Sequence, residues 1–288
     1  MSLTEQPPNT ASNTTIKDRS TFSQQMRAFP WWAVILTVSL AVALAKMLQD
    51  PIYREALSFI TNPDTTVETG FPPPLDVITA GIRVTLYVTI VSYLIALVVG
   101  LVLGIMRVSK NPILFHASTL YVEVMRGVPM LVLILWIGFV VVPALREASN
   151  GAFQLTRIQG AILGLGFGYA AYLAEVYRAG IESISRGQME AARSVGMSYV
   201  QAMRYVILPQ AIRRVVPPLA NDFVAMLKDS ALVSVVAVPE ILQSARLFVS
   251  RTFRAFEGYN SAAFLYLVLT LMFIFVVRFI ERRWKTGV

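Results

Sequence analysis

Long apolar stretches dominate the pattern of positions along the chain. Runs of 18 or more nearly uncharged residues, such as 31–48, 84–106 and 261–277, alternate with shorter polar segments. A helix of about 20 apolar residues crosses the roughly 30 Å hydrocarbon core of a bilayer. The pattern therefore predicts an all-α, polytopic membrane protein. Its six transmembrane helices are expected at about 31–48, 77–106, 114–142, 158–177, 215–236 and 261–277.

The polar segments divide the chain into regions. Residues 1–30 are rich in Ser, Thr, Asn, Gln and Pro, and we expect a disordered tail before the first helix at 31–48. Residues 49–76 are rich in Pro, which predicts a loop with one short surface helix around 53–60. Residues 77–283 then form the main transmembrane domain.

Composition narrows the class of protein. Hydrophobic residues make up 56% of the 288 residues and charged residues only 15%, with a mean hydropathy of +0.61, which excludes a soluble globular domain. The chain has no Cys and a single histidine, His116, which we expect to be an ordinary interfacial residue. Disulfides, thiol nucleophiles and multi-histidine metal sites are therefore excluded. No phosphate-binding loop motif occurs, so we expect no catalytic residue, metal or cofactor on this chain.

The net charge of +8 is informative through its distribution. In the six-helix arrangement, 15 Lys and Arg residues fall on the side of the two termini and six on the opposite side. Cytoplasmic loops of membrane proteins carry the excess of Lys and Arg. Both termini are therefore expected in the cytoplasm and 49–76 outside it, and the positive charge gives no reason to expect nucleic acid as a partner.

The segment 185–209 leaves the membrane but has the pattern of a helical hairpin. Ser185 with Gln188, and Ser198 with Gln201, have the spacing of capping boxes. Gly196 lies between them, where a left-handed helix terminus favours glycine, and Pro209 is expected to end the second helix. A preformed cytoplasmic hairpin predicts a docking surface for a partner protein.

The hairpin also carries a spaced motif. Glu190, Ala191 and Ala192 are followed by three residues, then Gly196, nine further residues and the run 206–209, Val-Ile-Leu-Pro. This arrangement resembles the EAA loop of the inner-membrane permease subunits of binding-protein-dependent ABC importers, with Val206 where isoleucine is usual. Further runs resemble the polar amino acid branch of these permeases, at 123–132, 174–181, 217–223 and 227–240.

The resemblance covers about 76–283 and implies partners and roles. Such permeases have a five-helix core, so 31–48 looks like an added N-terminal helix. The resemblance implies an inner-membrane location, two ABC ATPase subunits that hold ATP and Mg, a second permease subunit, identical or similar, and a soluble amino-acid-binding protein. It also implies that the hairpin is the coupling helix region, with these residues at the contact: Glu190, Ala191, Ala192, Arg193, Gly196, Leu208 and Pro209. Glu190 and Arg193 would pair with the ATPase; alternatively, Glu190 caps the hairpin internally.

One helix carries a polar stripe through an apolar segment. At 100° per residue, Asn221, Asp222, Lys228 and Asp229 share an arc of about 120°. Charged side chains inside a bilayer are costly and mark substrate or ion pathways. The stripe is therefore a candidate wall of the substrate path, with carboxylates for an ammonium group and Lys228 for a carboxylate. The alternative is a structural ion pair between Lys228 and Asp229 at a subunit interface.

Two further groups are candidates. Glu175, flanked by Tyr169 and Tyr172, could face the amino group of a substrate, or it could pair with Arg178 three residues later. Gly127 and Pro129 are expected to break or kink the third helix.

Beside this break, Arg126 is expected to pair with Glu123, with carboxylate binding as its alternative role. The glycine pairs 100/104 and 160/164, with Gly166 and Gly168, predict close helix packing.

The preferred function is thus a permease subunit of an ATP-driven importer for polar amino acids. A secondary transporter or channel without an ATPase is the main alternative, and a membrane scaffold is a third, which leaves the polar stripe unexplained. Because the stripe holds charges of both signs, the sequence leaves acidic, basic and neutral polar substrates open.

Overall fold

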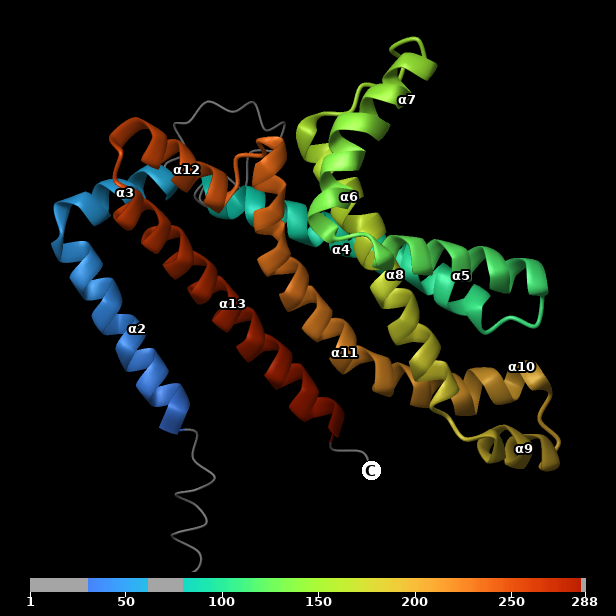
Figure 1. Cartoon of the computed structure of the whole chain (residues 1–288). Helices are drawn as coiled ribbons and strands as arrows, with labels where there is room; N and C mark the ends of the chain where they lie inside the picture. Colours follow the sequence, from blue (N-terminus) through green and yellow to red (C-terminus); the bar gives the residue numbers. More distant parts are fainter. Residues whose placement is uncertain (1–30, 62–79, 286–288) are drawn as a thin grey trace, which may run out of the picture. The chain divides into compact units, whose positions relative to one another are not determined.

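The structure is a computed structural model that describes residues 31–61 and 80–285. Every regular element in these two ranges is a helix, as the sequence predicts (Figure 1). The tail 1–30 and the part of the 49–76 loop after Thr61 lie outside the described residues. The helices are α2 (Trp31–Gln49), α3 (Pro51–Thr61), α4 (Ala80–Arg107), α5 (Pro112–Gly127), α6 (Met130–Trp136), α7 (Val142–Ala148), α8 (Arg157–Glu182), α9 (Arg186–Ser194), α10 (Tyr199–Ala202), α11 (Leu208–Asp229), α12 (Ile241–Thr252) and α13 (Ala255–Lys285). Three shorter segments join neighbouring helices: the π-helical η2 (Ile137–Val141) and η3 (Met203–Ile207), and the 3₁₀-helical η4 (Ser230–Val236).

The chain divides into two compact units between Arg54 and Glu55. The first unit contains α2, which forms over the stretch expected for the added helix. The second unit contains every helix from α4 onward and most of α3, the short helix expected around 53–60.

Fewer helices are long and apolar enough to span a membrane than the six spans that the sequence predicts. Among the described residues, three helical stretches are long and apolar enough to cross a bilayer: 81–107, 130–148 and 255–279. Two bent pairs, 34–61 and 199–252, raise this number to five if each pair counts as one span. The expected third span at 114–142 is interrupted, because α5 ends at Gly127 and α6 begins at Met130. Six spans therefore remain a prediction.

Glycines bring α8 against helices on two of its sides. A Cβ atom added at Gly100 of α4 would lie 2.9 Å from the Cβ of Leu173, and one at Gly104 would lie 2.7 Å from the Cβ of Tyr177. Another, added at Gly164 of α8, would lie 3.3 Å from the Cα of Ile134 in α6. The predicted packing role of these glycines is confirmed, and α8 is the central helix of this part of the fold.

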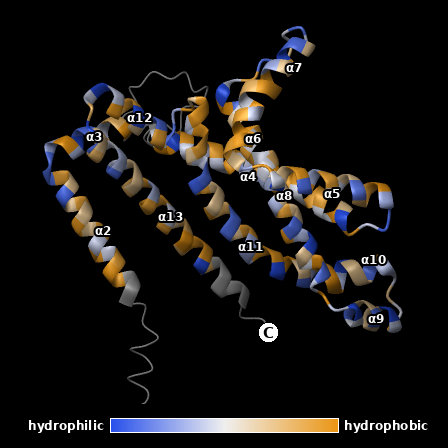
Figure 2. Ribbon diagram, in the orientation of Figure 1, coloured by the Kyte–Doolittle hydropathy of each residue, from blue (hydrophilic) through white to orange (hydrophobic). Residues whose placement is uncertain are grey.

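The helix that carries the polar stripe starts in the hairpin. The expectation that Pro209 ends the second hairpin helix is wrong, because helical backbone runs from α10 through η3 into α11. Pro209 occupies the first turn of α11, where a missing N–H is tolerated. Hydrophobic residues run along α4 and α13, whereas hydrophilic residues gather on α9 (Figure 2).

Candidate functional site

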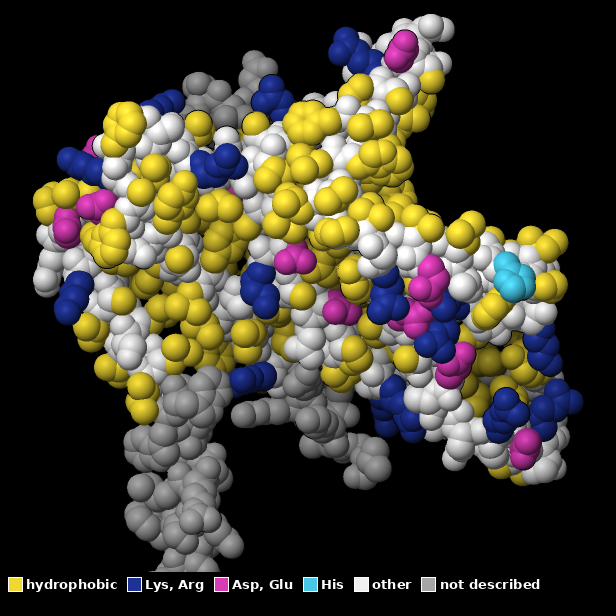
Figure 3. All heavy atoms as spheres, in the orientation of Figure 1, with side chains coloured by type: hydrophobic (Ala, Val, Ile, Leu, Met, Phe, Trp, Pro, Cys, Tyr) yellow, Lys and Arg dark blue, Asp and Glu magenta, His cyan; other side chains and the backbone are white. Residues whose placement is uncertain are grey.

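The polar stripe lies on the accessible face of α11. Asn221 and Lys228 are exposed and Asp222 and Asp229 are partly exposed, whereas Val224 on the other side of the helix is only 7% exposed. The predicted angular separation is therefore reproduced: polar residues face open space and apolar residues face the core. Acidic and basic side chains are visible among hydrophobic ones on this part of the molecule (Figure 3).

Tyrosines from two other helices meet the stripe. The hydroxyl of Tyr169 in α8 donates a hydrogen bond to Oδ2 of Asp229 at 2.7 Å. The hydroxyl of Tyr93 in α4 donates to the carbonyl oxygen of Leu219, one turn before Asp222. Asp222 lies about one turn after Leu219 and two turns before Asp229, on the same face of α11. Three helices thus place two phenols and two carboxylates at one site.

The alternative role of the stripe, a pair between Lys228 and Asp229, is not formed. Among the described residues no ion pair within 4.0 Å joins these two side chains, and Asp229 is bonded to Tyr169 instead. The exposed ammonium of Lys228 is therefore available to another molecule or another subunit.

The carboxylate of Glu175 forms ion pairs with two arginines. Its carboxylate forms an ion pair with Arg107 at the end of α4, and Arg178 binds it at 2.7 Å from the next turn of α8. Arg178 also pairs with Glu182, and its hydrogen bond with Glu175 raises the pKa of the guanidinium, so Arg178 stays charged. The structure thus forms the Arg178 contact offered as the alternative, and little of the carboxylate is left for a substrate amino group.

The break after α5 forms as expected, but its arginine has another partner. Val128 and Pro129 are extended, so the chain turns between α5 and α6. Glu123 lies 4.0 Å from Arg107. No Arg126–Glu123 pair occurs among the described residues, and the Arg126 guanidinium instead lies over the Tyr172 ring at 5.5 Å. Glu123 and Arg126 therefore each contact another described residue, and they do not pair with each other.

A hollow of about 440 Å³ lies between α8 and α11 below the stripe. Glu175 and Arg214 line it, and Arg214 donates a hydrogen bond to the carbonyl oxygen of Ser183. Gly180 permits the close approach here, because a Cβ at this position would lie 2.0 Å from Cγ1 of Val215. The hollow is a continuation of the polar face toward the hairpin.

Of the two capping boxes predicted in the hairpin, one is formed. Ser198 accepts from the Gln201 N–H at 3.3 Å, and the Gln201 side chain accepts from the Ser198 N–H at 2.8 Å. The predicted box at Ser185 is wrong: Ser185 precedes α9 with no side-chain cap, and Gln188 bonds to Gln210 across the hairpin at 3.3 Å.

Gly196 makes the turn of the hairpin. Its φ angle of +89° lies in the left-handed region, which favours glycine, and the Met197 N–H closes the end of α9 onto the Ala192 carbonyl at 3.2 Å. No atom lies within 4 Å of a Cβ added at Gly196. The backbone conformation, and not crowding, requires the glycine.

The motif residues are divided between the inside and the outside of the hairpin. Ala192 is buried, whereas Glu190, Ala191 and Arg193 are exposed, as are Leu208 and Pro209 at its far end. Within the described residues no hydrogen bond or ion pair holds Glu190, so the internal cap offered as an alternative is absent. An acidic and a basic side chain therefore remain on the open surface of α9.

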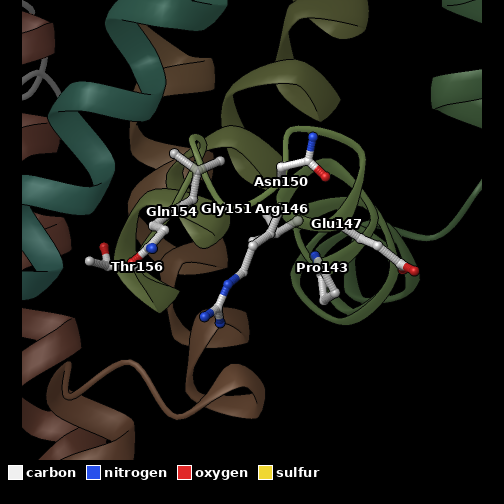
Figure 4. A pocket seen from close by; sticks show the side chains of 9 residues that line it. Pro143, Arg146, Glu147, Asn150, Gly151, Gln154 and Thr156 are labelled. Atoms are coloured by element: carbon white, nitrogen blue, oxygen red, sulfur yellow. The ribbon is translucent and has the colours of Figure 1, made fainter.

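A separate pocket of about 620 Å³ lies at the turn between α7 and α8. Figure 4 shows Arg146 and Glu147 from α7 extending in different directions, with Gln154 and Thr156 nearby. It contains none of the sequence-predicted site residues.

The sequence candidates do not include Tyr93 or Arg214, and they include Tyr169 only as a residue that flanks Glu175. Nothing in the local sequence marks these residues, so only their contacts with Asp229, Leu219 and Ser183 distinguish them. One faint signal existed, since Tyr169 precedes Glu175 within the same apolar segment.

Comparison with known proteins places the chain among membrane permeases. Residues 96–286 match the family described as binding-protein-dependent transport system inner membrane component. The probable amino-acid permease protein YxeN of Bacillus subtilis is 37% identical over 202 residues, which are 70% of this chain and 88% of that protein. The glutamine transport system permease protein GlnP of Escherichia coli is 33% identical over 213 residues, 74% of this chain and 95% of its own.

Solved structures agree with this placement. A crystal structure of an amino acid ABC transporter with histidines is 37% identical, has a TM-score of 0.64, and the match covers 70% of this chain and 92% of that chain. An inward-facing MetNI methionine ABC transporter, at 24% identity and a TM-score of 0.59, shares the fold over 71% of this chain and 94% of its own. Together with the EAA-type hairpin, these matches show that the chain belongs to the family of inner-membrane components of binding-protein-dependent transport systems.

Proposed function

We propose that this chain is the permease subunit of an ATP-driven importer for polar amino acids. Substrate would arrive from a soluble binding protein outside the membrane, and two permease subunits, identical or similar, would form the path. ATPase subunits that hold ATP and Mg would dock on the cytoplasmic hairpin. The names of relatives support the substrate class, since they include amino-acid, glutamine and arginine permease proteins.

One observation supports the coupling role most directly. The second arm of the hairpin is continuous with α11, so the exposed surface of α9 and the polar stripe belong to one helical lever joined at a single turn. The hairpin is also fixed to α11 by a small core of Ile184, Ile207 and Ala211. A push on α9 is therefore transmitted to the helix that carries Asp222 and Asp229, which is what alternating access driven by a separate ATPase requires.

The substrate path is proposed to run along the accessible face of α11. The carboxylates of Asp222 and Asp229 would attract an ammonium group, and the free ammonium of Lys228 a carboxylate. Glu175 and Arg126 would shape the path along α8 through their contacts with Arg107, Arg178 and Tyr172.

Gly196→Asp tests the coupling. A residue with a side chain is disfavoured by roughly 1 kcal/mol or more at this φ, and there is open space, so the turn should distort without disturbing the membrane domain. We expect the variant to insert and to retain its ATPase partner, but to lose most uptake while ATP hydrolysis continues.

Gly187→Asp is the matched control, because Gly187 lies in the same hairpin with equally open surroundings but without a positive φ. Parental uptake by Gly196→Asp, or failure of the native chain to recover any ATPase in a pull-down, would count against the proposal. The second result would leave a transporter that needs no ATPase.

A further inference from the structure

The turn between α4 and α5 and the second arm of the hairpin enclose an apolar hollow. It has a volume of about 740 Å³, and it is separate from the polar stripe and from the exposed surface of α9. Ten residues line it: Ile105, Val108, Ser109, Lys110, Ile181, Tyr199, Met203, Ile207, Leu208 and Ala211. Seven of these are aliphatic or methionine side chains, so the hollow suits hydrocarbon better than a polar metabolite.

Depth in the membrane restricts what can fill the hollow. Ile105 lies within 81–107, one of the stretches able to cross a bilayer, while Ser109 and Lys110 follow its end. Because Ile105 is two residues from the end of that stretch, the hollow lies at the level where the apolar zone would meet the headgroups. A soluble protein domain would meet its outer rim, whereas an acyl chain can lie along its whole length.

The charge at the rim of the hollow indicates which lipid headgroup the hollow prefers. Lys110 is exposed, and no ion pair within 4.0 Å involves it among the described residues. Figure 3 shows hydrophobic side chains at the floor of a hollow beside α10, with Lys and Arg side chains around its edge. Basic pockets between helices on the cytoplasmic side of a membrane bind anionic lipid headgroups.

We propose that this hollow binds one anionic phospholipid, with an acyl chain against Ile105, Ile181 and Met203 and the phosphate beside Lys110 and Ser109. The lipid would fill the space between the end of α4 and the hairpin arm that continues into α11. The face concerned is the one that the Lys and Arg distribution assigns to the cytoplasm.

Binding of lipid to the purified full-length chain tests the proposal. The chain in detergent is titrated with a phosphatidylglycerol or with a phosphatidylcholine of the same acyl chains, and bound lipids are counted by native mass spectrometry. We expect one site that prefers phosphatidylglycerol, and Lys110→Gln should weaken it about fivefold, since a Lys near an anionic surface contributes about 1 kcal/mol.

Two variants separate the hollow from general surface charge. Ile105→Trp adds bulk at an exposed lining position and should also weaken the site, while the charge is unchanged. Arg213→Gln removes another exposed cation, which does not line the hollow, and it should leave the site intact. Equal binding of phosphatidylglycerol by the native chain, Lys110→Gln and Ile105→Trp would overturn the proposal, as would equal binding of the two lipids.

A cysteine-labelling experiment distinguishes a lipid occupant of the hollow from a protein occupant. Because the chain has no Cys, Ser109→Cys gives a single thiol in the hollow. In phosphatidylcholine nanodiscs we expect it to react with a water-soluble maleimide, and phosphatidylglycerol should slow the reaction. Protection by the co-purified ATPase, with none from phosphatidylglycerol, would show that a soluble subunit covers the hollow and would overturn the lipid assignment.

Discussion

At the scale of the residue, the pairing of charges separates pathway candidates from structural ones. Glu175 is bound by Arg107 and Arg178, whereas Asp222 makes no hydrogen bond or ion pair with another described residue. A carboxylate that is already paired has little to gain from a ligand, because new contacts replace existing ones. Asp222, which lies between the positions of α11 that Tyr93 and Tyr169 contact, is the stronger candidate for contact with an ammonium group.

Cysteine labelling tests this distinction. In this Cys-free chain, Asp222→Cys should react with a water-soluble thiol reagent and saturating substrate should protect it, because a thiolate needs water. Val224→Cys, on the buried side of the same helix, should react far more slowly. Loss of transport alone would be uninformative, since it does not distinguish a substrate contact from a structural role. Equal and unprotected labelling at both positions would remove the stripe as the substrate route.

A second residue-scale prediction concerns Glu240, which is 0% exposed. Its carboxylate accepts hydrogen bonds from the N–H groups of Leu242 and Gln243 at 2.8 and 2.7 Å and from the Tyr266 hydroxyl. Glu240→Ala leaves these donors unsatisfied, so we expect a loss of about 1–3 kcal/mol and a lower Tm of the purified chain. Glu240→Gln keeps an acceptor oxygen and should lose less; an equal loss would mean that the charge matters more than the cap.

At the scale of the element, helix contacts depend on where side chains are missing. Gly100 and Gly104 let α4 approach α8, and Gly180 lets α8 approach α11. The contact of α8 with α11 differs from the contact of α4 with α8 because it lies between the polar stripe and the hairpin. Any change in this contact should therefore affect transport as well as stability.

Gly180→Ala tests this contact with a built-in rescue. The new methyl group would lie 2.0 Å from Cγ1 of Val215, a β-branched side chain with little rotamer freedom. We expect overpacking of about 1–3 kcal/mol, with lower Tm and reduced amino acid uptake. Val215→Ala removes the obstructing atom, so the double variant should recover both properties relative to Gly180→Ala. A double variant as impaired as the single one would contradict the contact.

At the scale of the whole molecule, the charge distribution predicts the orientation of the chain in the membrane. The 15 Lys and Arg residues on one side against six on the other predict that both termini are cytoplasmic. This arrangement requires an even number of spans, and a spanning helix at 31–48 would supply the sixth to the expected five-helix core.

Reporter fusions test the orientation. A reporter that is active only in the cytoplasm should be active both after Val288 and before Trp31. Moving it to the turn between α7 and α8 should abolish activity and serves as the control for export. An inactive N-terminal fusion beside an active C-terminal one would mean that α2 does not span, which would leave the five-helix core alone.

The sequence by itself determined the helical membrane class, the hairpin turn at Gly196 and the angular separation of the stripe. These features depend on local properties, since apolar length, helix periodicity and backbone φ preferences act within a few residues. The same locality explains the errors. Three details depend on neighbours that are distant in sequence. They are the capping of α9 by Ser185, the end of a helix at Pro209 and the choice of the arginine that reaches Glu123.

Only the tertiary structure decided the partners of the charges. Arg107 lies 68 positions before Glu175, and Tyr169 lies 60 positions before Asp229, so no local pattern indicates either contact. In the low-dielectric interior a charge or hydroxyl bonds to whichever suitable group the packed helices bring within reach. The glycine faces of α4 and α8 fix that packing, and the packing in turn leaves Asp222 and Lys228 open while Glu175 is closed.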